Sequence, residues 1–170
     1  LVSNQEFLAF VEANGYQQAE YWTEEGWAWR NFSAATQPTF WRKKNNTWFL
    51  RLMTQEVPMC WDWPVEVNYH EAAAFCQWLS QQQGKTIRLP TEDEWQHLYQ
   101  KSGLQHPQEQ QACHANLHLD HYASSCPVNQ FAHGELFDVV GNVWQWTETP
   151  TYPFEGFDVH PIYDDFTTPT

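Results

Sequence analysis

The hydrophobic pattern predicts three amphipathic helices, each of which begins at a capping box. In a capping box, a Ser, Thr or Asn side chain accepts a hydrogen bond from the amide three residues later, and a Glu at that position returns a bond to the cap. The boxes span residues 3–6, 68–71 and 91–94, and apolar residues follow each box at intervals of three and four. We therefore predict helices from Ser3 to Gly15, from Asn68 to Gly84 and from Thr91 onward, with Trp95 and Leu98 facing inward in the third.

The remaining pattern predicts one more helix and several short strands. A helix is expected over residues 19–31, weakened by Gly26, with Trp22 and Trp29 on one face. Alternating or apolar runs bounded by turn residues predict strands. These runs are 40–42 and 48–52 around a polar turn, then 65–67, 86–89 and a strand-turn-strand over 137–147. Capped helices mixed with short aromatic strands indicate the α+β class.

An aromatic stretch over residues 137–165 is the most unusual part of the chain. Trp144 and Trp146 occupy alternate positions, which point the same way in an extended segment. Gly141-Asn142 is a turn signal directly before them. After Pro150 the segment is too rich in Pro and Gly for a helix or a central strand, yet too aromatic for a solvated loop. We predict an ordered irregular loop of the kind that forms binding sites.

Composition narrows the possible partners. The chain has 170 residues, which suits one domain, and a formal charge of -13 from 8 basic and 21 acidic side chains. This charge argues against a nucleic-acid or anionic membrane surface. No apolar run approaches the roughly 18 residues of a membrane span, and no signal-peptide pattern opens the chain. We expect a cytoplasmic protein with neither type of partner, in which the 11 tryptophans serve an aromatic core or stack on ligands.

Cysteine and histidine residues gather between positions 113 and 126. A helix there could place two imidazoles on one face, and thiolates could complete a zinc site. However, the surrounding polar residues and the Ser-Ser-Cys-Pro run do not favour a continuous helix, and the spacing fits no standard zinc finger. Solvated loop histidines are therefore the preferred interpretation over a metal site. The residues concerned are Cys113, His114, His118, His121 and Cys126.

Two blocks of the sequence resemble the formylglycine-generating-enzyme family of sulfatase-modifying factors. They are Arg-Leu-Pro-Thr-Glu-Asp-Glu-Trp at 88–95 and Gly-Asn-Val-Trp-Gln-Trp at 141–146. Within this superfamily, residues 147–170 resemble the 5-histidylcysteine sulfoxide synthases of the ovothiol pathway, which are similar to the ergothioneine-pathway synthases. The resemblance implies a C-type-lectin-like fold with little regular structure. It also implies one partial domain over residues 1–170, preceded by an iron-binding helical domain and followed by a further carboxy-terminal block.

The resemblance to sulfoxide synthases implies a reaction and a set of site residues. Those enzymes use non-haem Fe(II) and O₂ to join cysteine sulfur to an imidazole carbon of histidine. Their iron is held by three histidines of the preceding helical domain, so no iron ligand is expected in this chain. Tyr152 is the expected proton donor, with Tyr163 as the second choice, because a phenol supplies a proton while remaining neutral at pH 7. The expected substrate-binding residues are Phe157, His160, Tyr163, Asp164 and Asp165, whose carboxylate pair suits an ammonium or imidazolium. Packing beside Pro153 and Phe154 is the alternative role for Tyr152.

A structural calcium site is also implied by the resemblance. In formylglycine-generating enzymes the matching segment wraps Ca²⁺ with oxygen ligands, and here those positions are Asp138, Gly141, Val143 and Gln145. Gln145 replaces a glutamate, which removes one negative charge. The alternative is a self-contained turn closed by Asn142.

Two other functions stay open beside the ovothiol-type synthase. One is an ergothioneine-type synthase, which takes a methylated histidine and a different thiol donor. The other is a lectin-like binding module without catalysis. For the ovothiol-type synthase, the expected small-molecule partners are cysteine, histidine and O₂.

Overall fold

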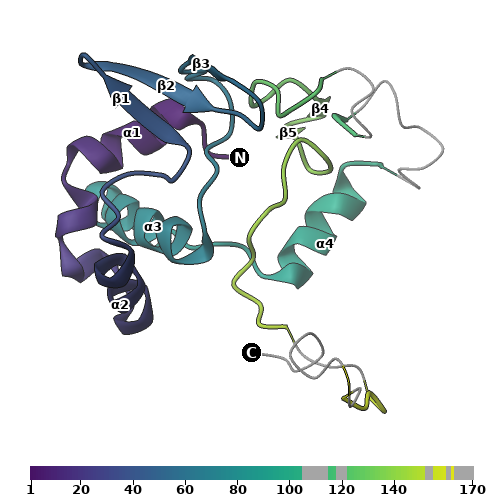
Figure 1. The fold of residues 1–170 in the computed structure, drawn as a ribbon. Helices are drawn as coiled ribbons and strands as arrows, with labels where there is room; N and C mark the ends of the chain where they lie inside the picture. Colours follow the sequence, from purple (N-terminus) through teal and green to yellow (C-terminus); the bar gives the residue numbers. More distant parts are fainter. Residues whose placement is uncertain (105–114, 118–121, 152–154, 160–161, 163–170) are drawn as a thin grey trace.

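The computed structural model describes residues 1–104, 115–117, 122–151, 155–159 and 162 (Figure 1). The helices are α1 (Asn4–Glu12), α2 (Glu24–Ser33), α3 (Tyr69–Gln83) and α4 (Glu92–Lys101), with 3-10 turns η1 (Gly15–Gln17) and η2 (Ala19–Tyr21). One antiparallel sheet contains β1 (Trp41–Lys44), β2 (Thr47–Arg51) and β3 (Glu56–Pro58) in that order, and β4 (Ala132–His133) pairs with β5 (Leu136–Phe137). Helices mixed with small antiparallel sheets confirm the α+β prediction.

All three predicted capping boxes are present in α1, α3 and α4. The side chains of Ser3, Asn68 and Thr91 each accept a bond from the amide three residues on, and the glutamate there bonds back to the cap amide. Helix α3 ends where expected, at Gly84 with a left-handed φ of 63°. The helix starts could be predicted because a capping box is a local interaction that needs no distant partner.

The helix predicted over residues 19–31 forms differently. The 3-10 turn η2 comes first, and α2 begins only after Thr23, whose side chain accepts a bond from the Gly26 amide. A threonine cap fixes the start of a helix because it satisfies one of the free amides there. Trp22 therefore lies before the helix and shares no helical face with Trp29, although their rings stack with centroids 6.2 Å apart.

Three predicted strand segments lack the expected pairing. Residues 65–67 and 86–89 form no strand, and the segment after β5 bends at Gly141 and Asn142, which have φ angles of 80° and 65°. Where residues 86–89 would need a partner strand, the Ser80 hydroxyl instead accepts the Ile87 amide at 2.8 Å. Alternation therefore predicted strands here but could not show whether another strand lies alongside.

The predicted hairpin forms β1 and β2, with Trp41 opposite Leu50. Its two turn residues, Asn45 and Asn46, have φ angles of 47° and 64°. This is the left-handed pair that a two-residue hairpin requires and that asparagine tolerates. The predicted hairpin is thus confirmed, but its turn is shorter than expected, because Lys43 and Lys44 belong to β1 and pair with Trp48 and Thr47.

The core is aromatic. Phe7, Phe10 and Phe75 pack between α1 and α3, and the Phe7 and Phe75 rings stack at 5.2 Å. A second cluster of Trp41, Leu50 and Met59 lies on the sheet. Buried Asn4 connects α1 to this second cluster, because it accepts a bond from the Trp41 indole at 3.2 Å and donates to the Cys60 carbonyl at 2.8 Å. Aromatic packing thus accounts for several tryptophans in this half of the chain.

Helix α4 contributes no buried residue to this core, so the expected inward orientation of its apolar residues is wrong for Leu98, which is exposed. Trp95 is half-buried, stacks on Tyr99 at 5.6 Å, and donates its indole N–H to the Val139 carbonyl at 3.2 Å. In Figure 1, α4 stands apart from α1 and α3 and beside the segment that follows β5. Its role is to support that segment.

A buried hydrogen bond between Tyr16 and Glu71 gives the first testable prediction. The Tyr16 hydroxyl donates to Glu71 Oε1 at 2.5 Å, and Glu71 Oε2 accepts the Asn68 amide at 2.9 Å. Burial raises the pKa of Glu71, while these two bonds lower it. In Tyr16→Phe the carboxylate loses a partner, and the free energy of unfolding should fall by about 2 kcal/mol at pH 7. Tyr21→Phe, whose hydroxyl donates to Gln18 at 3.2 Å, should cost less.

The pH dependence of this loss follows from the direction of the Glu71 shift. A carboxyl with a raised folded-state pKa contributes stability below its unfolded pKa and loses that contribution as the pH rises through the folded value. Removing the Tyr16 hydroxyl raises the Glu71 pKa further. Urea titrations should therefore show a larger deficit for Tyr16→Phe at pH 7 than at pH 4.5. An equal deficit at both pH values would mean that the carboxylate is not the group affected.

Candidate functional site

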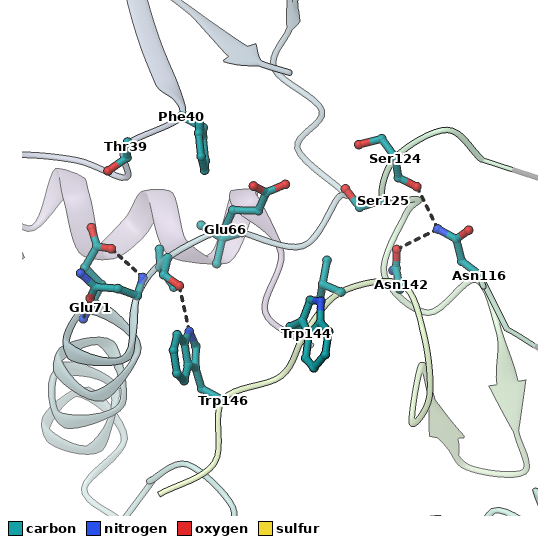
Figure 2. A pocket seen from close by; sticks show the side chains of 14 residues that line it. Thr39, Phe40, Glu66, Glu71, Asn116, Ser124, Ser125, Asn142, Trp144 and Trp146 are labelled. Atoms are coloured by element: carbon teal, nitrogen blue, oxygen red, sulfur yellow. Dashed lines mark hydrogen bonds between the residues drawn. The ribbon is translucent and has the colours of Figure 1, made fainter. Parts of the chain in front are cut away.

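A cavity of about 720 Å³ lies between the two halves of the described chain. Residues from before β1 and from the segment leading into α3 form one wall, and residues around the Gly141-Asn142 turn form the other (Figure 2). The lining residues are Thr39, Phe40, Val65, Glu66, Val67, Asn68, Glu71, Asn116, Ser124, Ser125, Asn142, Val143, Trp144 and Trp146.

Asn142 fixes the second wall. Its side chain accepts the Cys126 amide at 2.8 Å and donates to the Cys126 carbonyl at 3.1 Å, while its own amide donates to the Asn116 carbonyl at 2.9 Å. Gly141 must be glycine, because a Cβ there would lie 2.7 Å from the Asn116 carbonyl oxygen and its φ is 80°. The turn is therefore held at both residues, but the Asn142 side chain bonds to Cys126, sixteen residues away, so the turn is not self-contained as the alternative expected.

The two tryptophans after this turn both line the cavity, as their alternate spacing predicted. Trp146 is anchored: its indole donates to the Val67 carbonyl at 2.9 Å, and its ring meets Tyr69 edge-on at 6.1 Å. The side chain of Trp144 is fully exposed. Trp146 thus connects the two walls, while Trp144 presents its ring to the open space (Figure 2).

The chain beyond Trp146 is pinned to the start of α4. Glu148 donates its amide to the Pro90 carbonyl at 2.9 Å, and its carboxylate lies 3.2 Å from Arg88. Arg88 also forms two bonds of 2.8 Å with Glu94, and this guanidinium lowers the pKa of Glu94 to about 2. The Thr149 hydroxyl accepts the Glu92 amide at 2.9 Å. The block at 88–95 therefore has a structural role, because its residues hold Glu148 and Thr149 in the segment that leads to Tyr152.

Most of the predicted catalytic and substrate-binding residues lie outside the described residues. These are Tyr152, His160, Tyr163, Asp164 and Asp165, and the same holds for Cys113, His114, His118 and His121 of the possible zinc cluster. Phe157 is described and exposed, and it is not among the residues that line the cavity. Cys126 is fully buried. Within the described ranges, no three His, Cys, Asp or Glu side chains gather as metal ligands would.

The predicted calcium ligands fit a cation only in part. Asp138 is buried, with one carboxylate oxygen accepting the Asn129 amide at 2.7 Å and the other without a partner. Burial raises the pKa of this carboxyl. However, the Gly141 carbonyl accepts the Val143 amide at 2.9 Å, and the Gln145 side chain donates its N–H to the Asp138 carbonyl at 2.9 Å. Gln145 thus makes a bond that a glutamate could make only through a cation.

Gln145→Glu tests how this loop is closed. The carboxylate would face the Asp138 carbonyl without a proton to donate, so the free energy of unfolding should fall by about 2 kcal/mol in EDTA. Added Ca²⁺ should restore stability in the variant much more than in the wild type, because the new carboxylate and Asp138 can both bind it. Thermal melts of both proteins with EDTA and with CaCl₂ measure this. Equal stabilisation of both proteins by Ca²⁺ would instead support a calcium site in the natural loop.

Sequence reasoning missed one charged residue of the cavity, Glu66. It lies between Val65 and Val67 in a segment that was predicted as a strand, and its carboxylate makes no hydrogen bond or ion pair within the described part of the chain. Burial raises its pKa. A glutamate between two valines was the available signal, but the sequence alone could not show that this extended segment borders a cavity.

Comparisons with known proteins identify the family. Residues 1–157 match the Sulfatase-modifying factor enzyme 1-like domain. Hercynine oxygenase of Mycobacterium tuberculosis is 29% identical over 99% of this chain and 40% of its own length, and that of Mycolicibacterium thermoresistibile is 31% identical over 99% and 38%. Formylglycine-generating enzyme of Thermomonospora curvata is 29% identical over 85% of this chain and 56% of its own length.

The chain thus spans about two-fifths of the length of the hercynine oxygenases that it matches. In the part of the chain that the structure describes, no helix has the length and apolar character of a membrane span. The match over residues 1–157 includes both sequence blocks and the turn that shapes the cavity. This chain belongs to the family of Sulfatase-modifying factor enzyme 1-like domains.

Proposed function

We propose that this chain is the formylglycine-generating-enzyme-like part of a larger sulfoxide synthase, which joins cysteine sulfur to the histidine imidazole with Fe(II) and O₂, as in ovothiol biosynthesis. The observation that carries the proposal is the similarity to enzymes named hercynine oxygenase along 99% of this chain. That similarity runs beyond the shared turn into the aromatic segment after Trp146, where residues 147–170 carry the resemblance to the ovothiol-pathway enzymes.

In this proposal the chain supplies the substrate surface and a proton donor. Tyr152 holds the proton at its phenol oxygen, three residues after Thr149, whose hydroxyl accepts the Glu92 amide at the start of α4. Phe157, His160, Tyr163, Asp164 and Asp165 bind substrate, and the acidic pair suits its cationic groups. The anchored Glu148 and Thr149 give the loop a fixed point of departure.

The iron belongs to another part of the parent polypeptide. The described residues bring no suitable set of three ligands together. When bound there, Fe(II) supplies the activation of O₂. The chemistry assigned to this chain is therefore limited to binding, orientation and proton delivery.

An ergothioneine-type synthase is the second candidate, and the names of the hercynine oxygenase relatives favour it. Its histidine substrate is methylated and its thiol donor differs. The acidic pair Asp164-Asp165 favours an unmethylated histidine, because a free ammonium can donate hydrogen bonds to carboxylates and a methylated one cannot. A lectin-like module without catalysis is the third candidate, favoured by the open cavity.

A competition assay on the complete parent polypeptide separates the candidates. The protein would receive Fe(II), O₂ and cysteine with equal concentrations of histidine and Nα-trimethylhistidine, and the products would be identified by mass spectrometry. The proposal predicts that the histidine adduct predominates. Consumption of the methylated histidine alone would assign the ergothioneine-type reaction, and a protein that retains no iron and forms no adduct would be a binding module.

A further inference from the structure

The three-stranded sheet carries a concentration of positive charge. The chain has 8 lysine and arginine side chains, and half of them lie between residues 42 and 51, a stretch that contains no aspartate or glutamate. They are Arg42, Lys43, Lys44 and Arg51. Because the formal charge of the whole chain is -13, this hairpin is opposite in sign to the rest of the molecule.

The strand register places three of these cations on the outer face of the sheet. Side chains at alternate positions of a strand share a face, as do the side chains of directly opposite residues in neighbouring strands. The set that shares the outer face is Arg42 and Lys44 of β1, Thr47, Phe49 and Arg51 of β2, and Glu56 of β3. The other face holds Trp41 and Leu50, which are buried in the core cluster against α1 (Figure 1).

One carboxylate on the outer face serves all three cations. Glu56 accepts a hydrogen bond from Lys44, and that bond lowers the pKa of Glu56. The positive charges of Arg42 and Arg51 lower this pKa further, so both guanidinium groups lie near the same carboxylate. Neither arginine forms an ion pair within the described residues, and Arg51 is exposed. The outer face therefore keeps positive charge that the described part of the chain does not neutralise.

Two of the three cations are held in defined positions. Arg42 donates to the carbonyls of Thr39 and Trp41 at 2.7 and 2.9 Å. The ammonium of Lys44 lies 5.7 Å from the centre of the half-buried Phe49 ring, whose face attracts cations. A partner would therefore meet ordered positive groups arranged around an apolar ring.

Protection of a sheet edge does not explain the whole pattern. Lysines on an edge strand discourage pairing with other chains, and β1 is an edge strand that carries Lys43 and Lys44. Arg51, however, lies on β2, the central strand of the sheet. An edge role leaves Arg51 unexplained, whereas a binding role for the outer face includes it.

The size and spacing of the patch indicate which kind of anion fits it. Exposed charges more than about 8 Å apart are largely screened at physiological salt, so a ligand confined to the patch responds to the local cations. A nucleic-acid duplex or an anionic membrane would extend beyond the patch, over a molecule that is acidic as a whole. Arg42 and Lys44 are two residues apart on one strand, or about 7 Å, which matches alternate carboxylates of an extended peptide.

We propose that the outer face of the β1–β2–β3 sheet binds an extended acidic segment of a partner protein. Carboxylates at alternate positions of that segment pair with Arg42, Lys44 and Arg51 around the Phe49 ring. The inference goes beyond the proposed reaction and does not rest on it, because none of these four residues lines the cavity or has a part in the chemistry. A failure of the binding test would leave the sulfoxide synthase proposal standing, and the reverse also holds.

Fluorescence anisotropy with the complete parent polypeptide tests the proposal. The probe is a labelled peptide in which glutamate alternates with threonine, and the comparison peptide has glutamine in place of each glutamate. The glutamate peptide should bind about tenfold more tightly, because it forms several exposed ion pairs. Its affinity should decrease as the salt concentration rises. Arg51→Gln should weaken its binding about threefold, whereas Glu56→Gln should strengthen it about threefold by removing a carboxylate that competes for the cations.

Matched controls come from charges away from the sheet. Lys101→Gln removes an exposed cation at the end of α4, and Glu135→Gln removes an exposed carboxylate between β4 and β5. Both variants should bind the glutamate peptide like the wild type, and thermal melts should show that all four variants stay folded.

Equal binding of the two peptides would overturn the proposal, as would unchanged affinity in Arg51→Gln or in Glu56→Gln. Tighter binding of a DNA duplex or of phosphatidylserine vesicles than of the glutamate peptide would also overturn it, because the face would then recognise a different polyanion.

Discussion

Replacing Asn142 with alanine should lower the free energy of unfolding by about 3 kcal/mol, since it deprives buried backbone groups of two hydrogen bonds. The asparagine side chain satisfies both the amide and the carbonyl of Cys126, which is fully buried. Alanine has no polar side-chain atom, so the Cys126 amide and carbonyl both lose their partner in the variant. Urea titration followed by tryptophan fluorescence measures the loss.

Asn129→Ala is the matched control for this experiment. Asn129 has the same φ of 65°, but it is exposed and its side chain has no hydrogen bond. Both variants place alanine in left-handed backbone at a cost of about 1 kcal/mol. The difference between the two variants therefore isolates the side-chain contribution of Asn142, and we expect it to be about 2 kcal/mol. Equal losses in both variants would show that Asn142 is needed only for its backbone conformation.

Tyr152→Phe should reduce formation of the histidine–cysteine adduct by about 100-fold or more, which is the usual contribution of a positioned proton donor. The phenylalanine keeps the ring and removes only the proton. The assay compares wild type and variant in the complete polypeptide with Fe(II), O₂, cysteine and histidine. If the variant forms cysteine sulfinate instead of the adduct, that product would also indicate that proton delivery has been lost.

Two other tyrosines sharpen this comparison. Tyr163→Phe tests the second choice of donor, and Tyr99→Phe is a control on α4, where Tyr99 stacks on Trp95. Only the variant of the proton donor should show the large decrease in adduct formation. If Tyr152→Phe keeps full activity and Tyr163→Phe does not, the donor is Tyr163. Full activity in both would remove tyrosine proton delivery from the proposed mechanism.

Local interactions explain which parts of the fold could be predicted. The capping boxes at Ser3, Asn68 and Thr91 and the hairpin turn at Asn45-Asn46 form between residues close in sequence, and all of them are present. The predicted strands at 65–67 and 86–89 were wrong because a strand needs a neighbouring strand. Here Val65 donates its amide to the Val2 carbonyl next to an isolated bridge between Ser3 and Pro64, and Ile87 bonds to the hydroxyl of Ser80. Amphipathic spacing in α4 likewise could not show that no core lies against Leu98.

The cavity could not be predicted, because it is formed by long-range contacts that the sequence alone does not reveal. The Gly141-Asn142 turn and the shared orientation of the two tryptophans were predictable from residue type and spacing. The bonds from Asn142 to Cys126, sixteen residues away, and from Trp146 to Val67, 79 residues away, are long-range and define where the turn lies. Glu66 enters the cavity only because those contacts bring its segment opposite the turn.

The most direct test of the central proposal is the structure of the product made by the complete polypeptide. Cysteine, histidine labelled with ¹³C in the imidazole ring, Fe(II) and ¹⁸O₂ would be supplied, and the product analysed by NMR and mass spectrometry. The proposal predicts a bond between sulfur and an imidazole carbon and one ¹⁸O atom in the sulfoxide. Unchanged histidine from an iron-loaded polypeptide given all substrates would contradict it.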